Sequence, residues 1–148
     1  MESFPNQSCF LFVVVLSIFV LVHAGKAMAE DWKFFASDKK FDYYFDAASK
    51  IHVGKDILAI KVKSICVDKE KFLSDVKTFG KSVEKYEKYG HNIISAKVDC
   101  SSKKCLIELV TEYDNEGKVI DYAAGALTNW SPVSEGTLGE ILYQAACH

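Results

Sequence analysis

Residues 130–148, WSPVSEGTLGEILYQAACH, are the most informative part of the sequence about the fold, because they predict a short apolar C-terminal helix that carries a cysteine. Thr137 and Glu140 have the spacing of a capping box, in which two side chains satisfy backbone groups at the start of a helix. Apolar residues then recur at helical spacing, at Leu138, Ile141, Leu142 and Ala145. A helix this short is unstable by itself in water, so we expect it to lie on a sheet with Cys147 holding it there.

Cys147 needs a partner, and three other cysteines follow the N-terminal apolar run: Cys66, Cys100 and Cys105. An even number of cysteines in an exported chain favours disulfide bonds over free thiols. We prefer Cys100 as the partner, since it lies on the apolar side of its predicted strand, and this choice pairs Cys66 with Cys105. The alternative pairs Cys100 with Cys105 across a tight turn and leaves Cys66 for Cys147. Closing the long loop between Cys100 and Cys147 would stabilise the fold by about 4 kcal/mol through loop entropy.

The N-terminal residues predict export. Residues 9–22, CFLFVVVLSIFVLV, form an apolar run that is shorter than the roughly 20 residues of a membrane-spanning helix. Ala27 and Ala29 follow this run with the A-x-A spacing of a signal-peptide cleavage site. We therefore predict a signal peptide over residues 1–29, with a cut after Ala24 as the second choice and no integral membrane segment afterwards. Because no Lys or Arg precedes the run, an uncleaved anchor is the alternative.

Composition limits the functions open to the remaining residues, 30–148. Their number is that of a single domain with one core. The chain has a formal net charge of −2 and contains no Arg, so a nucleic-acid partner is not expected.

The residue types that usually carry catalysis or bind metal do not form recognisable motifs. No metal-binding His spacing, nucleophile elbow or glycine-rich phosphate loop is present in the sequence. His52 and His91 are expected in solvated loops, and His148 is the chain end. The carboxylates that could serve in acid–base chemistry are interpreted as strand-end and turn residues: Asp42, Asp46 and Asp114. We predict no catalytic, cofactor or metal site, and therefore a non-enzymatic domain.

Alternating apolar and polar residues predict an antiparallel sheet. In residues 57–67, ILAIKVKSICV, Leu58, Ile60 and Val62 share one face and the lysines lie on the other. The stretch CLIELVTEY alternates in the same way, and the residues expected on its apolar face are Cys105, Ile107 and Leu109. The other strands are expected over residues 31–37, 41–47, 92–100 and 118–126. Tight turns, SSKK and DNEG, join successive strands, so we predict an α+β fold with an antiparallel meander of about six strands.

A different period begins at Asp68. Apolar residues recur three or four positions apart, and the lysines lie mostly off the stripe formed by Phe72, Val76, Phe79, Val83 and Tyr86. Asp68 is the expected N-cap and Gly90 the expected stop, so we predict one amphipathic helix inserted between two strands. Its lysine-rich face is interpreted as a solvated surface.

Aromatic residues crowd near the start of the predicted domain. Those that we assign to a candidate interface are Trp32, Phe35, Phe41, Tyr43, Tyr44 and Phe45. They alternate partly across two faces of the predicted strands, so one set belongs to the core. The other set would be exposed, and exposed aromatic patches mark homodimer contacts or ligand surfaces. The alternative is that both faces are buried, with the inserted helix covering the second one.

Several of these segments resemble the bacterial surface-adhesin protein E family. The resemblance runs from Trp32 to Cys147 and rests on four further segments: DYYFD at 42–46, ILAIKVKS at 57–64, VDC at 98–100 and GTLGE-x-LY at 136–143. It implies that a disulfide, here between Cys100 and Cys147, holds the C-terminal helix against an antiparallel sheet. It also implies a location at the cell surface or in the periplasm, and the characterised type binds host matrix proteins and is dimeric. Cys66, Cys105 and the long inserted helix depart from the family pattern.

The expected function is therefore that of an exported, non-enzymatic binding module without a cofactor. Its expected role is recognition of an extracellular or envelope protein, with adhesion as the leading interpretation and a homodimer as a candidate form. The alternative is a small periplasmic inhibitor or accessory protein that acts on one protein partner. An enzyme would instead need a concave pocket that gathers polar side chains from several strands.

Overall fold

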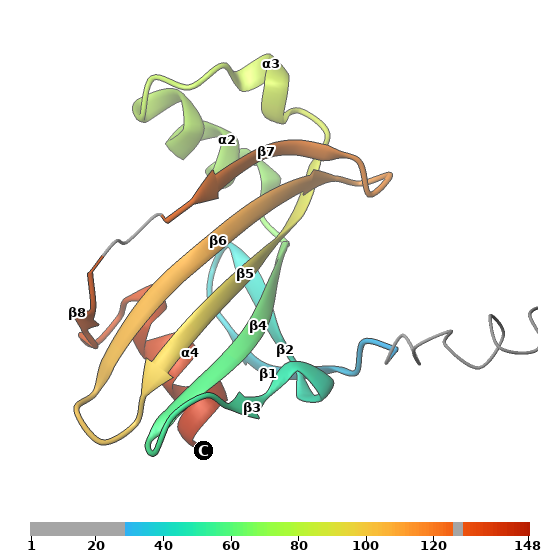
Figure 1. Cartoon of the computed structure of the whole chain (residues 1–148). Coiled ribbons are helices and arrows are strands. Elements are labelled where there is room, and N and C mark those ends of the chain that lie inside the picture. Colours follow the sequence, from blue (N-terminus) through green and yellow to red (C-terminus); the bar gives the residue numbers. More distant parts are fainter. Residues whose placement is uncertain (1–28, 126–128) are drawn as a thin grey trace, which may run out of the picture.

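A strongly curved antiparallel sheet forms most of the molecule (Figure 1). The computed structural model describes residues 29–125 and 129–148, so the predicted signal peptide lies outside them apart from Ala29. The strands are β1 (Trp32–Ser37), β2 (Phe41–Asp46), β3 (Ile51–His52), β4 (Ile57–Cys66), β5 (Tyr89–Asp99), β6 (Lys104–Asp114), β7 (Val119–Ala124) and β8 (Ser131–Pro132). The helices are the 3-10 turn η1 (Ala47–Ser49), α2 (Lys69–Thr78), α3 (Val83–Tyr86) and α4 (Leu138–Cys147).

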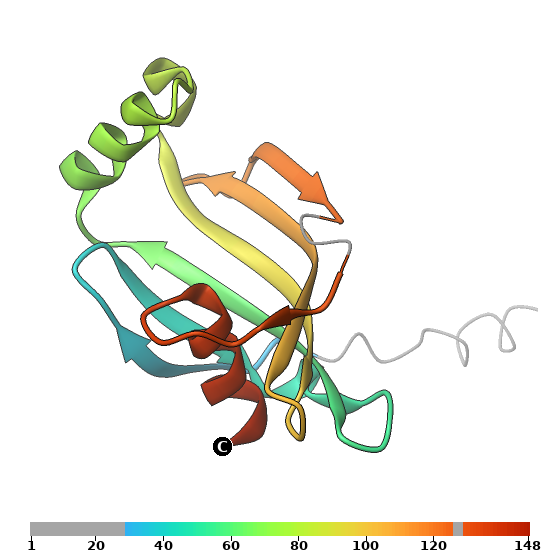
Figure 2. The same ribbon diagram turned by 90° about the vertical axis from the view of Figure 1, so that its left-hand side faces the viewer.

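The sheet is a meander with one side covered. Its strands follow the order β1-β2-β4-β5-β6-β7, all neighbours are antiparallel, and the short strands β3 and β8 pair with β4 and β6. Helix α4 lies against the concave face, and α2 and α3 lie at the far end of the sheet (Figure 2). The predicted α+β architecture is confirmed. No helix in the described ranges is both long and apolar enough to cross a membrane.

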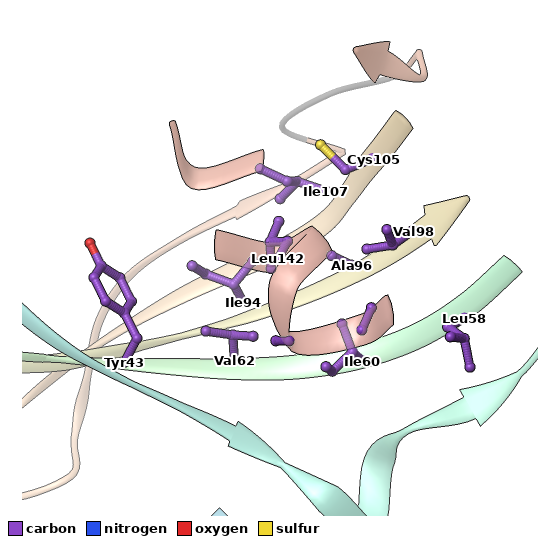
Figure 3. Packing of buried hydrophobic residues seen from close by; sticks show 12 residues of the cluster. Tyr43, Leu58, Ile60, Val62, Ile94, Ala96, Val98, Cys105, Ile107 and Leu142 are labelled. Atoms are coloured by element: carbon purple, nitrogen blue, oxygen red, sulfur yellow. The ribbon is translucent and has the colours of Figure 1, made fainter. Parts of the chain in front are cut away.

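The main core lies between the concave face and α4 (Figure 3). The alternation predicted for residues 57–67 is confirmed, because Leu58, Ile60 and Val62 are all buried. The strand β5 contributes Val98 to the same core, and α4 contributes Leu142. Each such side chain stabilises the fold by about 1.5–3 kcal/mol when it leaves water.

A disulfide between Cys100 and Cys147 ties α4 to the end of β5, as the sequence predicted. The two Cα atoms are 5.8 Å apart. The helix remains regular through Cys147 and reaches Cys100 by rolling on the sheet, so that Tyr143 also packs against the core. Three other residues of the helix face the sheet and are buried: Leu142, Ala145 and Ala146. The last ten-residue helix is therefore held both covalently and by apolar packing.

The capping box is present in a shifted form. The Thr137 hydroxyl accepts a hydrogen bond from the Glu140 backbone N–H at 3.4 Å, as expected for an N-cap. The Glu140 carboxylate accepts from the Gly136 N–H at 2.7 Å, one residue before the predicted donor. Gly136 has φ of +71°, a left-handed conformation that turns its N–H toward the helix start and that other residues rarely adopt.

The predicted pairing of Cys66 with Cys105 is wrong, since both residues are free thiols. Cys66 ends β4, beside the start of β5, where Ile65 pairs with His91. Cys105 starts β6, beside the end of β5, where it pairs with Val98. Seven residues of strand separate these two places, which corresponds to roughly 23 Å at the rise of a β-strand. A disulfide cannot span that distance.

The apolar face predicted for residues 105–113 is correct for Cys105 and Ile107 but wrong for Leu109. Ser95 pairs with Leu109 whereas Ala96 pairs with Ile107, so Glu108 is an extra residue in β6. This bulge reverses the alternation beyond it, and Val110 instead of Leu109 packs on the core.

The single helix predicted over residues 68–89 is interrupted. Helix α2 starts at the predicted N-cap, where the Asp68 carboxylate accepts from the Lys71 N–H at 3.0 Å, but it ends before Gly80, whose φ is +70°. Phe79 consequently points outward and is 79% exposed. Gly90 does not stop a helix but lies within β5, where a Cβ would approach the backbone of Asn115 to 3.0 Å.

The two short helices close the second end of the concave face. Val76 of α2, Tyr86 of α3 and Tyr89 of β5 form a small separate core. Phe72 stacks on Tyr89 with ring centroids 4.3 Å apart. The stripe predicted from the sequence therefore faces the sheet at Phe72, Val76 and Tyr86, although the helix carrying it is broken.

Replacing Cys147 with serine should lower the free energy of unfolding by about 4 kcal/mol, because the 47-residue loop then opens in the unfolded chain. Urea unfolding followed by circular dichroism measures the change. Cys66→Ser, which alters a half-buried thiol without opening a loop, is the matched control and should cost much less. Equal losses in the two variants would contradict a stabilising role for the disulfide.

Candidate binding face

Among the residues that the structure describes, no helix packs on the convex face of the sheet (Figure 2), and one row of side chains crosses that face from edge to edge. Each member is paired directly with the next across all six strands: Phe34, Tyr44, Lys63, Ile93, Thr111 and Tyr122. We call these six residues the convex row. Its two ends are well exposed, Phe34 by 58% and Tyr122 by 70%. Exposed apolar area on an open sheet face marks interaction sites, so the row is a candidate contact surface.

The β1 end of the convex row is held in place by specific contacts. The Lys63 ammonium lies 4.1 Å from the centroid of the Trp32 ring, which is cation–π geometry. The Trp32 indole N–H donates to the Glu30 carboxylate at 2.9 Å. Phe34 meets Tyr44 edge to face, with ring centroids 5.6 Å apart. These contacts orient three aromatic rings on a rigid strand pair before any partner arrives.

His91 and Tyr113 continue the aromatic surface beside the convex row. Their rings are stacked, with centroids 4.9 Å apart and planes 9° from parallel. His91 was expected in a solvated loop, but it lies in β5 and is half-buried. Burial lowers the pKa of His91, and the nearby positive charge of Lys63 lowers it further, while Glu30 opposes them. The ring is therefore biased toward its neutral form, which stacks on Tyr113.

The aromatic residues predicted as an interface divide between the two faces. Trp32 and Tyr44 lie on the convex side, but Tyr43 is buried in the core and is not available for contact. The other three pack against the core from partly buried positions: Phe35, Phe41 and Phe45. A bulge in β1 between Phe34 and Ala36 interrupts the alternation, so that Ala36 lies on the core side together with Phe35.

The remaining members of the convex row were not predicted as a site. Phe34 was recognisable as part of the aromatic cluster, and Lys63 as the outward position of an alternating strand. Ile93, Thr111 and Tyr122 come from strands far along the chain and join the row only through the strand register. No local signal in the sequence marks them.

The buried carboxylates, Asp46 and Asp114, accept hydrogen bonds from backbone N–H groups near the ends of their strands. Asp46 accepts from the backbone N–H groups of Asp31 at 2.9 Å and Ala48 at 3.1 Å. Asp114 accepts from the N–H groups of Glu116 and Lys118 in the β6–β7 turn. Their interpretation as strand-end and turn residues is confirmed. In the ranges 29–125 and 129–148, no three His, Cys, Asp or Glu side chains are placed to hold a metal ion.

A disulfide-tethered α+β domain with an uncovered aromatic sheet face has the architecture expected of a small binding domain. The family model for surface-adhesin protein E matches residues 32–148. The chain belongs to this family, as its resemblance at the sequence level implied. Membership suggests a surface adhesin, and the family is generally non-enzymatic. Neither a curated protein nor a solved structure was found to match the chain.

The pKa of His91 should lie below its ordinary value of about 6.5. Stability is then complete above that value and declines as the pH falls through the folded-state pKa, because protonation favours the unfolded chain. An NMR titration of the imidazole measures the pKa directly. Lys63→Met should raise it, and Lys61→Met, on the same strand, should not. A pKa that both substitutions leave unchanged would contradict the role given to Lys63.

Proposed function

We propose that this protein is an exported adhesin whose convex row binds an extracellular or envelope protein. The observation that carries the proposal is the match of residues 32–148 to the surface-adhesin family in a fold that leaves Phe34 and Tyr122, the two ends of this row, exposed. The domain acts by recognition and not by catalysis.

The composition of the convex row suits a protein partner. Tyrosine and tryptophan are enriched at the energetic centres of interfaces, and the rings of Trp32, Tyr44 and Tyr122 lie on this side of the sheet. Lys63 lies among the rings and pairs with no carboxylate in the described residues, so its charge is available to a partner. Since specific contacts hold the rings of Trp32, Phe34 and Tyr44 in place, binding at the β1 end of the row costs little side-chain entropy.

The proposed location is the cell surface or the periplasm. The signal-peptide prediction for residues 1–29 supports export. The Cys100–Cys147 disulfide supports an oxidising compartment, where such bonds persist. At the surface, the convex row would meet host matrix proteins. In the periplasm, the same row would serve an inhibitor or accessory protein with one envelope partner.

Surface plasmon resonance of the purified exported protein on immobilised vitronectin and laminin tests the adhesin proposal. We expect saturable binding with a Kd in the micromolar range, and Phe34→Ala should weaken it by about tenfold or more, as removal of an interface anchor does. Phe79→Ala is the matched control, because Phe79 is also an exposed phenylalanine but lies at the helix end of the concave side.

Two results would count against this proposal. Absence of binding to both matrix proteins at micromolar concentration would remove the adhesin role, and specific capture of one periplasmic protein would then favour the inhibitor or accessory role. Equal effects of Phe34→Ala and Phe79→Ala would show that the convex row is not the contact surface.

A further inference from the structure

A pocket of about 190 Å³ opens on the concave side, between the two short helices and the sheet. Four aromatic side chains are among the residues that line it: Phe41, Phe72, Phe79 and Tyr86. A second hollow of about 80 Å³ adjoins it along β6 and β7, and Lys81 and Glu112 line both. We call the two together the concave pocket. The larger hollow lies on the opposite side of the sheet from the convex row, and the smaller one reaches the sheet edge, where Tyr122 of that row also lines it.

Contacts between aromatic rings hold the wall of the concave pocket in place, and the larger hollow has room for one apolar side chain. Phe72 meets the rings of Phe41 and Tyr86 edge to face, each at a centroid distance of 6.0 Å, and stacks on Tyr89. Phe79 remains largely exposed beside this wall. An enclosed apolar cavity of about 150 Å³ binds a benzene ring, so the larger hollow, which is open to solvent on one side, has room for an aromatic or branched side chain.

The polar end of the concave pocket offers one donor and one acceptor. The Lys81 ammonium donates to the Tyr86 hydroxyl at 3.2 Å, and that hydroxyl donates to the Glu112 carboxylate at 2.7 Å. Burial, followed by the hydrogen bond to Glu112, raises the pKa of Tyr86, so the hydroxyl stays protonated. The described residues place no ion-pair partner on Lys81 or Glu112, whereas the neighbouring charges are paired, Lys40 with Asp75 and Lys85 with Asp121.

This arrangement is complementary to a peptide group. A backbone C=O can accept from the ammonium of Lys81, and a backbone N–H can donate to the free oxygen of Glu112. The positive charge of Lys81 and the negative charge of Glu112 balance, so the site favours neither a strongly cationic nor a strongly anionic ligand. A peptide group next to an apolar side chain supplies both the dipole and the ring or branched group that the aromatic wall can enclose.

We propose that the concave pocket binds a partner polypeptide by one aromatic or branched apolar side chain, with the adjacent peptide group held between Lys81 and Glu112. This would be a second recognition site, on the other side of the sheet, and it does not depend on the adhesin role of the convex row. The partner is defined by its chemistry, an exposed apolar residue in an accessible chain segment.

The test uses protein expressed from the full sequence, exported by the host and labelled for backbone-amide NMR. The probe is N-acetyl-L-phenylalaninamide, which has an aromatic side chain between two amide groups. Saturable shifts are expected for amides of α2, α3 and β6, with a Kd on the order of 1 mM for so small a ligand. N-acetylglycinamide, which lacks the side chain, and toluene, which lacks the amides, should each bind at least about fivefold more weakly.

Variants separate the pocket from the rest of the surface. Phe79→Ala removes an exposed part of the wall and should weaken the probe severalfold, and Glu112→Gln should weaken it by removing the charge while keeping the shape. Phe34→Ala, on the convex row, should leave probe binding unchanged. This pattern would support the proposal whether or not the protein binds matrix proteins.

Three outcomes would overturn the proposal. One is the absence of saturable shifts at the pocket amides. Another is equal binding of toluene, which would make the pocket a site for free apolar molecules. The third is the appearance of the same amide shifts when the protein concentration is raised without the probe. This result would mean that a second copy of the chain occupies the pocket.

Discussion

The rest of the structure depends on the attachment of α4 to the concave face. The helix has ten residues and could not persist alone, and the sheet without it would expose the apolar side of its three longest strands. Burial of Leu142 and its neighbours supplies the packing, and the Cys100–Cys147 bond prevents the end of the chain from leaving. For a domain whose net stability is about 5–15 kcal/mol, a bond that contributes about 4 kcal/mol is a large share.

This attachment also decides which surfaces are left for recognition. Helix α4 fills one end of the concave face, and α2 and α3 fill the other, so the core is complete without help from the convex side. The side chains of the convex row therefore do not pack against any of the described helices. Where α2 ends, before Gly80, the helical cover of the sheet is interrupted, and the concave pocket lies beside that break. Both proposed recognition surfaces follow from this division of the sheet between covered and uncovered parts.

Much of the fold could be predicted because its signals are local. The alternation at Leu58, Ile60 and Val62, the Thr137 cap and the preferred partner of Cys147 each depend on a few adjacent residues or on one face of one strand. The errors have a different origin. The bulge at Glu108 and the opposite positions of Cys66 and Cys105 depend on strand register, which no short segment encodes. The same limit applies to the candidate site, because Tyr122 joins Phe34 only through five successive strand pairings.

The most direct test of this account is a peptide map of the purified protein, alkylated and digested without reductant and read by mass spectrometry. We expect one disulfide-linked pair of peptides, containing Cys100 and Cys147, and alkylated thiols at Cys66 and Cys105. A Cys147 that is alkylated, or that is linked to any cysteine other than Cys100, would contradict the attachment of α4 and with it the arrangement of both faces.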